Sequence, residues 1–262
     1  MEMQARKLIR GHLPILISMP HTANFIPAAI KGRMTPQGLI TPDTDWHIDT
    51  LYNFALEMGA SMLYATHSRY VADLNRDPVD SDLYPGQVKT GVCPLQTFSG
   101  SDIYKNGEEP DAIERVNRIA AYWQPYHEAL AQELAVIKKR YGFAILYDAH
   151  SIASRLPRLF EGRLPDLNLG TVHGKSCAEG MAQAALEAAK NSGYSHALNG
   201  RFIGGYITRH YGDPDNGIHA LQMELAQENY MNETPPFVFD RGRAEKLQIV
   251  LKNVIESILG VI

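Results

Sequence analysis

Residues 143–151 read Phe-Ala-Ile-Leu-Tyr-Asp-Ala-His-Ser, an apolar run that becomes polar at its carboxyl end. An earlier run, Ile-Leu-Ile-Ser-Met-Pro-His at residues 15–21, has the same form and also ends on a histidine. Short continuous apolar runs are typical of strands buried on both faces of a parallel sheet. Because ligands of open α/β sheets bind beyond the carboxyl ends of the strands, His21 and His150 are candidates for one shared site. Two neutral imidazoles converging there could hold a divalent metal.

The rest of the chain alternates between strand and helix patterns. Apolar residues recur at helical spacing through residues 43–58, and residues 112–141 predict one or two helices with a kink or break at Pro125. This alternation predicts an α/β fold with a mainly parallel or mixed central sheet and helices on both faces. We expect a single domain over residues 1–262. We also expect strands at residues 13–18, 61–66, 70–74, 143–147, 167–171 and 219–225, and further helices at 176–191 and 245–259.

The segment at residues 77–109 interrupts this alternation with many prolines, glycines and aspartates. Loops of that length are usually functional or disordered. Because the segment also carries Leu83, Tyr84, Phe98 and Tyr104, we predict an ordered excursion that acts as a lid.

Composition and charge exclude several classes of protein. The formal net charge of -4 gives no electrostatic footprint for nucleic acid or an acidic membrane. No apolar run approaches the roughly 20 residues that span a bilayer, and residues 1–7 lack the apolar core of a signal peptide. The two cysteines, Cys93 and Cys177, lie in unrelated contexts, which argues against a disulfide framework or a thiolate zinc site. We therefore expect a cytoplasmic enzyme, and the sequence leaves its oligomeric state open.

A metal site built on two histidines needs a third ligand, and the acidic segment at residues 43–49 could supply it. This segment reads Asp-Thr-Asp-Trp-His-Ile-Asp at the start of a predicted helix. Asp43 could serve only as the helix N-cap, but capping does not also explain Asp45 and Asp49. The alternative for each histidine is a purely structural role.

Asp148 is a candidate for orienting one of these histidines. It lies two residues before His150, so both side chains point to the same side of an extended segment. From there Asp148 could hold an imidazole or a water molecule in place. The alternative is an ordinary turn aspartate.

Two segments contain residues that could bind an anionic substrate. Arg76 lies beside a turn that ends in proline, where its planar guanidinium could bind a carboxylate, and Arg69 is a second candidate nearby. The glycine-flanked segment 204–212 contains Tyr206 and Arg209, which could both donate to an anion. The alternatives are that Arg76 and Arg69 are ordinary surface arginines and that segment 204–212 is a flexible surface loop.

Glu224 lies inside the otherwise apolar strand predicted at residues 219–225. A buried glutamate is costly unless it is paired or protonated. Partial burial would raise its pKa toward the range that suits a general base. The alternative is a strand position that faces solvent.

Several longer motifs stand out at residues 19–22, 43–47, 68–76, 83–86, 148–151, 204–212 and 222–224. These motifs resemble the N-formylglutamate amidohydrolase family, and the resemblance runs from about residue 12 to the C-terminus. Its members hydrolyse N-formyl-L-glutamate to formate and L-glutamate, the last step of one route of histidine degradation. The family is similar in fold to the zinc carboxypeptidases and aspartoacylases.

This resemblance implies roles for individual residues. His21 and His150 would be two ligands of one divalent metal, with zinc as the first candidate. Glu224 would be the general base. The pair Asn75-Arg76 resembles the Asn-Arg pair that holds a substrate carboxylate in the wider group of enzymes.

The sequence departs from those relatives at the third ligand, because Asn24 stands where they have a glutamate. We therefore expect the carboxylate ligand to be Asp45, with Asp43 and Asp49 as alternatives.

The substrate expected from the resemblance is a small dicarboxylate. Arg76 and Arg209, with Arg69 and Tyr206, would hold its two carboxylates, which need separate partners when buried. The remaining alternatives are a hydrolase of another N-acyl amino acid, a peptidase with a small C-terminal substrate, and a non-catalytic protein that binds an acidic metabolite.

Overall fold

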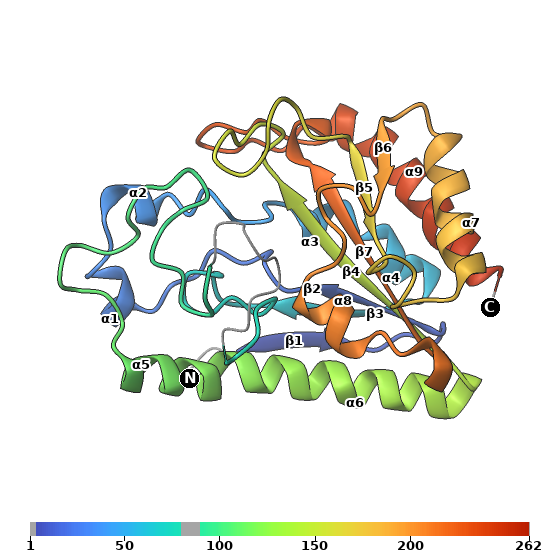
Figure 1. Ribbon diagram of the computed structural model, residues 1–262, viewed down its shortest axis with the longest axis horizontal. Coiled ribbons are helices and arrows are strands. Elements are labelled where there is room, and N and C mark those ends of the chain that lie inside the picture. The colour runs from blue at the N-terminus through green and yellow to red at the C-terminus, as the bar shows by residue number, and fades with distance from the viewer. Residues whose placement is uncertain (1–3, 80–89, 262) are drawn as a thin grey trace.

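The computed structural model describes residues 4–79 and 90–261, and within them the strands form one mixed sheet. The strands are β1 Arg6–Ile9, β2 Ile15–Met19, β3 Ser61–Ala65, β4 Ala144–Ile152, β5 Leu167–Gly170, β6 His196–Leu198 and β7 Ile218–Ala226. Their order is β1-β3-β2-β4-β7-β5-β6 (Figure 1). The central strands β3, β2, β4 and β7 are parallel, whereas β1 is antiparallel to β3 and β5 is antiparallel to β7. The expected α/β class with a mainly parallel, mixed sheet is therefore confirmed.

Helices cover both faces of the sheet. The α-helices are α1 Ala28–Lys31, α2 Pro36–Leu39, α3 Ile48–Leu51, α4 Phe54–Met58, α5 Ala112–Arg118, α6 Gln124–Tyr141, α7 Glu179–Lys190, α8 Tyr206–Tyr211 and α9 Arg241–Leu259. A π-helical segment (η1, Ile119–Trp123) joins α5 to α6, and 3-10 turns occur at Pro214–Asn216 (η2) and Gln227–Asn229 (η3). Helices α6 and α8 pack on one face, and α3, α4, α7 and α9 form the layer on the other (Figure 1).

Alternate side chains of the central strands enter two separate apolar clusters. In β2, Ile15 and Ile17 join the cluster beneath α9, whereas Leu16 joins the cluster beneath α6. The same alternation runs through β4 and β7. It turns His150 and Glu224, which are partners in the β4–β7 register, toward the α6 and α8 face. The polar ends of three parallel strands therefore meet on that face of the sheet.

Helix α9 illustrates why these layers are stable. The Asp240 side chain accepts a hydrogen bond from the Arg243 amide (3.0 Å), which satisfies one of the free N–H groups at the start of the helix. Fully burying an apolar side chain contributes about 1.5–3 kcal/mol. The buried side chains recur every three or four residues: Ala244, Leu247, Val250, Leu251, Val254, Ile255 and Ile258.

The helical backbone is not broken at Pro125, and the irregularity expected there is a π-helical segment just before the proline. The chain passes from α5 through the π-helical segment into α6, and Pro125 is in the first turn of α6. Proline has no N–H to donate, and the π-helical segment is where the regular α-helical hydrogen bonding of this long helix is interrupted.

The prediction of one helix over residues 43–58 is wrong. Residues 43–47 form a turn, and the helical part is divided into α3 and α4. Polar groups that could have started a helix bind distant partners instead. The Asp43 carboxylate accepts hydrogen bonds from the Tyr70 hydroxyl (2.6 Å) and the Phe98 amide (2.8 Å). These tertiary contacts hold the turn against the segments that carry Tyr70 and Phe98.

The predicted strand at residues 70–74 is also wrong, because these residues form turns. The Val71 amide bonds to the Ser68 carbonyl (2.8 Å), and the Asp73 amide bonds to the Val92 carbonyl (2.7 Å). Strand β4 continues to Ile152, five residues past its expected end at residue 147. His150 therefore lies within a strand and is held by its ladder.

Part of the predicted lid at residues 77–109 lies outside the described residues, including Leu83 and Tyr84. The described parts are residues 77–79 and 90–109, and the second carries Tyr104, whose side chain is buried and donates to the Tyr70 carbonyl (3.1 Å). That part packs on a third small cluster around Met34 and Ile103. Whether the segment acts as a lid remains a prediction.

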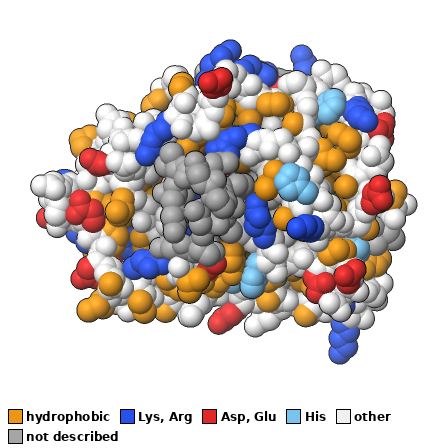
Figure 2. All heavy atoms as spheres, in the orientation of Figure 1, with side chains coloured by type: hydrophobic (Ala, Val, Ile, Leu, Met, Phe, Trp, Pro, Cys, Tyr) orange, Lys and Arg blue, Asp and Glu red, His pale blue; other side chains and the backbone are white. Residues whose placement is uncertain are grey.

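The surface carries no sign of a membrane-spanning segment in the described ranges: no helix there is long and apolar enough to cross a bilayer. On the face shown in Figure 2, hydrophobic side chains are interspersed with charged and polar ones. Apolar side chains scattered in this way are ordinary on protein surfaces.

Candidate metal centre and active site

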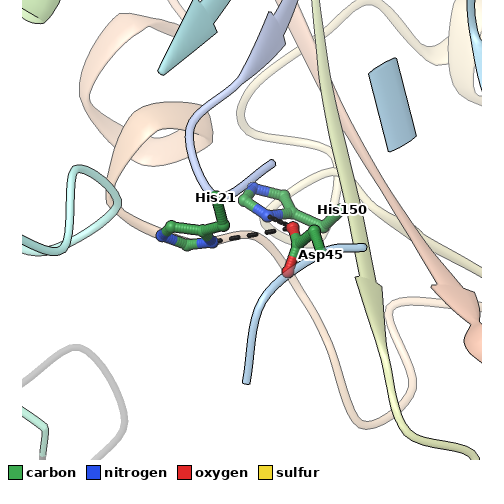
Figure 3. A group of neighbouring side chains, drawn as sticks. All are labelled: His21, Asp45 and His150. Atoms are coloured by element: carbon green, nitrogen blue, oxygen red, sulfur yellow. Dashed lines mark hydrogen bonds and ion pairs between the residues drawn. The ribbon is translucent and has the colours of Figure 1, made fainter. Parts of the chain in front are cut away.

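Three side chains from separate segments converge at the carboxyl ends of β2 and β4. His21 follows β2, His150 lies in β4, and Asp45 comes from the turn at residues 43–47, just before α3 (Figure 3). Asp45 Oδ2 lies 3.0 Å from His150 Nδ1 and 3.7 Å from His21 Nδ1. The Asp45 amide also donates to the His21 carbonyl (3.0 Å), which fixes the turn against the strand. All three side chains are buried, and their potential ligand atoms lie within 4.8 Å of one another.

The nitrogen of His21 that faces this cluster is available to a cation. His21 Nε2 lies 2.7 Å from Asp73 Oδ1, so Nε2 is the donor, and in the neutral imidazole Nδ1 then presents its lone pair. Nδ1 is buried and has no hydrogen-bond partner among the described residues. A lone pair that faces a carboxylate oxygen is unfavourable unless a cation lies between them. Two imidazole nitrogens and one carboxylate are also a donor set that zinc favours, so the residues fit a divalent metal.

Asp45 is the one candidate of the acidic segment that reaches both histidines. Burial disfavours its charge, but the hydrogen bond from His150 and the proximity of both His150 and His21 together lower the pKa of Asp45. Asp43 instead faces Tyr70, and Asp49 is exposed on α3. The geometry thus selects Asp45 from the three aspartates that the sequence left open.

Each histidine is held from behind by a further aspartate. Asp148 Oδ2 lies 3.0 Å from His150 Nε2, on the side of the imidazole away from Asp45. Burial opposes the charged form of His150, but Asp148 and Asp45 together raise the pKa of His150 well above its usual range. A metal at this position would take the place of any proton on His150 Nδ1, because a ligating imidazole nitrogen must be unprotonated.

The equivalent residue behind His21 is Asp73, which the sequence interpretation missed. Asp73 was assigned to a strand, although its position just before Asn75-Arg76 was a usable signal. Burial opposes its charge, but Arg69 and His21 hold the pKa of the Asp73 carboxyl well below its usual range. Carboxylates that bind the second nitrogen of a metal-bound histidine fix its tautomer and orientation.

Arg69 lies inside this acidic cluster. Its guanidinium donates to Asp73 Oδ2 (2.6 Å) and lies 4.0 Å from Asp45 Oδ1. The Arg69 Cζ atom lies over the Phe98 ring, 4.6 Å from the ring centroid. Counted as ionised, Asp45, Asp73 and Asp148 carry three negative charges against one on Arg69. A divalent cation between two neutral imidazoles would offset the negative charge of these carboxylates.

Asn75 links His150 to the segment that carries the other expected substrate residues. Its Nδ2 lies 3.0 Å from His150 Nε2, and its Oδ1 accepts a hydrogen bond from the Ile207 amide (2.8 Å). Asn75 therefore contacts both the triad and the first turn of α8, on which Tyr206 and Arg209 lie.

The remaining expected substrate residues have partners within the protein. Arg76 donates to Thr90 Oγ1 (2.8 Å) and to the Asn75 carbonyl (2.9 Å). Arg209 Nε donates to the Gly204 carbonyl (2.8 Å). The Tyr206 ring stacks on His210 with 4.9 Å between centroids. Their contact with a substrate stays a prediction.

Glu224 occupies the β7 position directly opposite His150 in the parallel register. Its Oε2 accepts a hydrogen bond from Gln222 Nε2 (3.2 Å). Burial raises the pKa of Glu224 to about 8, and the charge of His150 opposes that rise while that of Asp45 adds to it. A buried carboxylate with a pKa near neutrality suits proton transfer at physiological pH.

Comparison with known proteins places this site in a family. The chain matches the model of the N-formylglutamate amidohydrolase family over residues 13–231. It is 49% identical over 253 residues to the N-formylglutamate deformylase of Pseudomonas aeruginosa, an alignment that covers 96% of this chain and 94% of the relative. The N-formylglutamate deformylase of Pseudomonas putida is 47% identical over 252 residues, with the same coverage.

Solved structures agree with this assignment at the level of the fold. The N-formylglutamate amidohydrolase of Ralstonia eutropha superposes with a TM-score of 0.82 at 23% identity, covering 97% of this chain and 98% of that one. A protein of Agrobacterium tumefaciens gives a TM-score of 0.72 at 19% identity, covering 97% and 96%. The matched family model and the two close relatives show that this chain belongs to the N-formylglutamate amidohydrolase family.

Proposed function

We propose that this protein hydrolyses N-formyl-L-glutamate to formate and L-glutamate, using one divalent metal held by His21, Asp45 and His150. The observation that carries the metal assignment is the buried His21 Nδ1, which faces a carboxylate without a hydrogen-bond partner among the described residues. Membership of the family supports the substrate. Zinc is the first candidate, because the donor set is nitrogen and oxygen and contains no thiolate.

In this proposal Glu224 is the general base and general acid. A divalent metal in such a site lowers the pKa of water and polarises a carbonyl oxygen. Glu224 would take a proton from the attacking water and return it to the leaving amine nitrogen. The burial that raises its pKa to about 8 supports both steps, because the carboxyl can accept and release a proton near neutral pH.

The substrate carboxylates would be bound by the cationic and polar groups around α8. Asn75 and Arg76 would bind one carboxylate, and Arg209 with Tyr206 the other. Arg69 already neutralises Asp73. Arg69 would therefore assist substrate binding through its positive charge rather than through a bidentate hydrogen bond to a substrate carboxylate.

The proposed setting is histidine degradation in the cytoplasm. Both cysteines, Cys93 and Cys177, are buried free thiols, which is consistent with a reducing compartment.

The decisive test is hydrolysis of a panel of acylated amino acids, measured as release of the free amino acid. The panel pairs formyl, acetyl and succinyl groups with glutamate and with aspartate. We expect kcat/KM to be highest for N-formyl-L-glutamate. A higher value for another member would assign a different N-acyl amino acid, and ligand-induced thermal stabilisation without any product would assign a binding protein.

A further inference from the structure

Gln222 connects the first turn of α8 to the carboxylate of Glu224. Its Oε1 accepts a hydrogen bond from the Gly205 amide (2.6 Å), and its Nε2 donates to Glu224 Oε2 (3.2 Å). A backbone N–H can only donate, so the contact with Gly205 fixes which end of the Gln222 amide is oxygen. The N–H end must then point at Glu224. The side chain is 3% exposed, so water does not compete for either contact.

Two glycines permit this close approach. A Cβ atom on Gly205 would lie 2.4 Å from Asn75 Nδ2, and one on Gly170 would lie 2.7 Å from the Gly204 amide nitrogen. Gly170 is the register partner of Gln222 in β5. Larger residues would push residues 204–205 away from the strands, and the bond from Gly205 to Gln222 would be lost. The loop thus sets the orientation of the Gln222 amide.

Gln222 and Glu224 lie on the same side of β7, because they are two residues apart in an extended strand. The glutamate side chain has three rotatable bonds, and burial leaves its charge with little solvation. Among the described residues, the hydrogen bond to the Glu224 carboxylate comes from Gln222 alone. Without that bond the carboxylate could turn away from the triad.

We propose that Gln222 is a positioning residue that holds the Glu224 carboxylate in the orientation required for proton transfer. The inference rests on the proposed function of Glu224 as the base. A misplacement of a reacting group by about 1 Å can cost 100-fold in rate. Gln222 acts through Glu224, so its loss reduces turnover and leaves the binding of the substrate carboxylates intact.

A purely structural role makes a different prediction. If Gln222 only fastens residues 204–205, its loss would displace α8, which carries Tyr206 and Arg209. Substrate binding would then weaken, and KM would rise. The division of the effect between kcat and KM therefore separates the two roles.

The test replaces Gln222 with methionine, which has a similar length and forms neither hydrogen bond. We expect Gln222→Met to lower kcat for N-formyl-L-glutamate about 10- to 100-fold, to change KM less than threefold, and to leave the metal content unchanged. The matched control is Gln248→Met on α9, which removes the bond from Gln248 Nε2 to the Leu51 carbonyl of α3 (2.9 Å). That control should lose stability without losing kcat.

A kcat within threefold of wild type, or a rise in KM that accounts for the loss, would overturn the proposal. If Gln222→Met does not fold, Gln222→Asn keeps the polar group but is one methylene too short to reach both partners. Wild-type kcat in that variant would equally refute it.

A crystal structure of Gln222→Met separates this inference from the proposed function. If the wild-type protein releases no formate from N-formyl-L-glutamate, the proposed function fails on its own. The structure still decides the positioning role: we expect the Glu224 carboxylate to move or to occupy two conformers, and an unmoved carboxylate would refute it.

Discussion

Asp73→Asn should weaken metal binding without removing any metal ligand. Asp73 Oδ1 lies 2.7 Å from His21 Nε2 and also accepts a hydrogen bond from the backbone N–H of Asn75 (3.0 Å). The asparagine keeps the shape and can still accept from His21, but it removes the negative charge that increases the basicity of the imidazole. Loss of such a carboxylate typically reduces metal affinity 10- to 100-fold. That factor corresponds to about 1.4–2.7 kcal/mol in the free energy of binding.

The same substitution should cost some stability, because Asp73 also pairs with the buried Arg69 at 2.6 Å. Breaking a buried ion pair typically costs about 3–5 kcal/mol, since it leaves one charge uncompensated. The cost here should fall below that range, because Asp45 Oδ1 remains 4.0 Å from the guanidinium. The two effects are measured separately, by competition with a chromophoric chelator and by denaturant unfolding of the metal-free protein.

The control variant is Glu133→Gln. It neutralises another buried carboxylate, which binds Arg10 (2.9 Å) and Ser61 (2.8 Å) at the opposite end of β3 from the site. Metal affinity should be unchanged in Glu133→Gln and reduced in Asp73→Asn. Equal affinities in these two variants would refute the idea that Asp73 tunes His21.

Three further predictions concern the base, the substrate and the pH dependence of stability. Glu224→Gln should retain the metal and lose at least about 100-fold in kcat, and near-normal turnover would remove Glu224 from the chemistry. Arg209→Ala should lower kcat/KM for N-formyl-L-glutamate far more than it lowers the unfolding midpoint, and an unchanged kcat/KM would make Arg209 a bystander. Burial lowers the pKa of His127 to about 4, so the unfolded chain binds a proton there from about pH 6.5 downward while the folded chain does not. The free energy of unfolding should therefore fall by up to about 3 kcal/mol between pH 6.5 and pH 4 through this group. In denaturant titrations at several pH values, His127→Gln should show a smaller fall than the wild-type protein. An equal dependence of the free energy of unfolding on pH in both proteins would contradict this prediction.

The sequence predicted the parts of the site that depend on strand pattern. The apolar runs before His21 and His150 and around Glu224 correspond to β2, β4 and β7. Because these strands are parallel neighbours, their carboxyl ends meet, and the three side chains come together as a consequence of topology. No local pattern was needed beyond a buried strand that ends in polar residues.

The parts that depend on tertiary contacts could not be predicted in this way. The choice of Asp45 over Asp43 is made by Tyr70 and Phe98, which bind Asp43 from distant segments. Asp73 was assigned to a strand because residues 70–74 are mostly apolar, but its side chain lies in a buried turn between His21 and Arg69. Sequence spacing carries no information about such partners.

The edge strands were missed for a different reason. Strands β1 and β6 have four and three residues. Their residues are only partly buried, so neither shows the continuous apolar run that marks a central strand. A short edge strand is identified by the strand with which it pairs, and the local sequence does not contain that information.

The central claim is that the ion held by His21, Asp45 and His150 is required for hydrolysis of N-formyl-L-glutamate. The most direct measurement is formate release by one preparation before chelation, after chelation, and after readdition of zinc, with metal content determined at each stage. We expect about one bound ion per chain, loss of activity on its removal, and recovery in proportion to the zinc restored. Full activity in thoroughly metal-free protein would contradict the account.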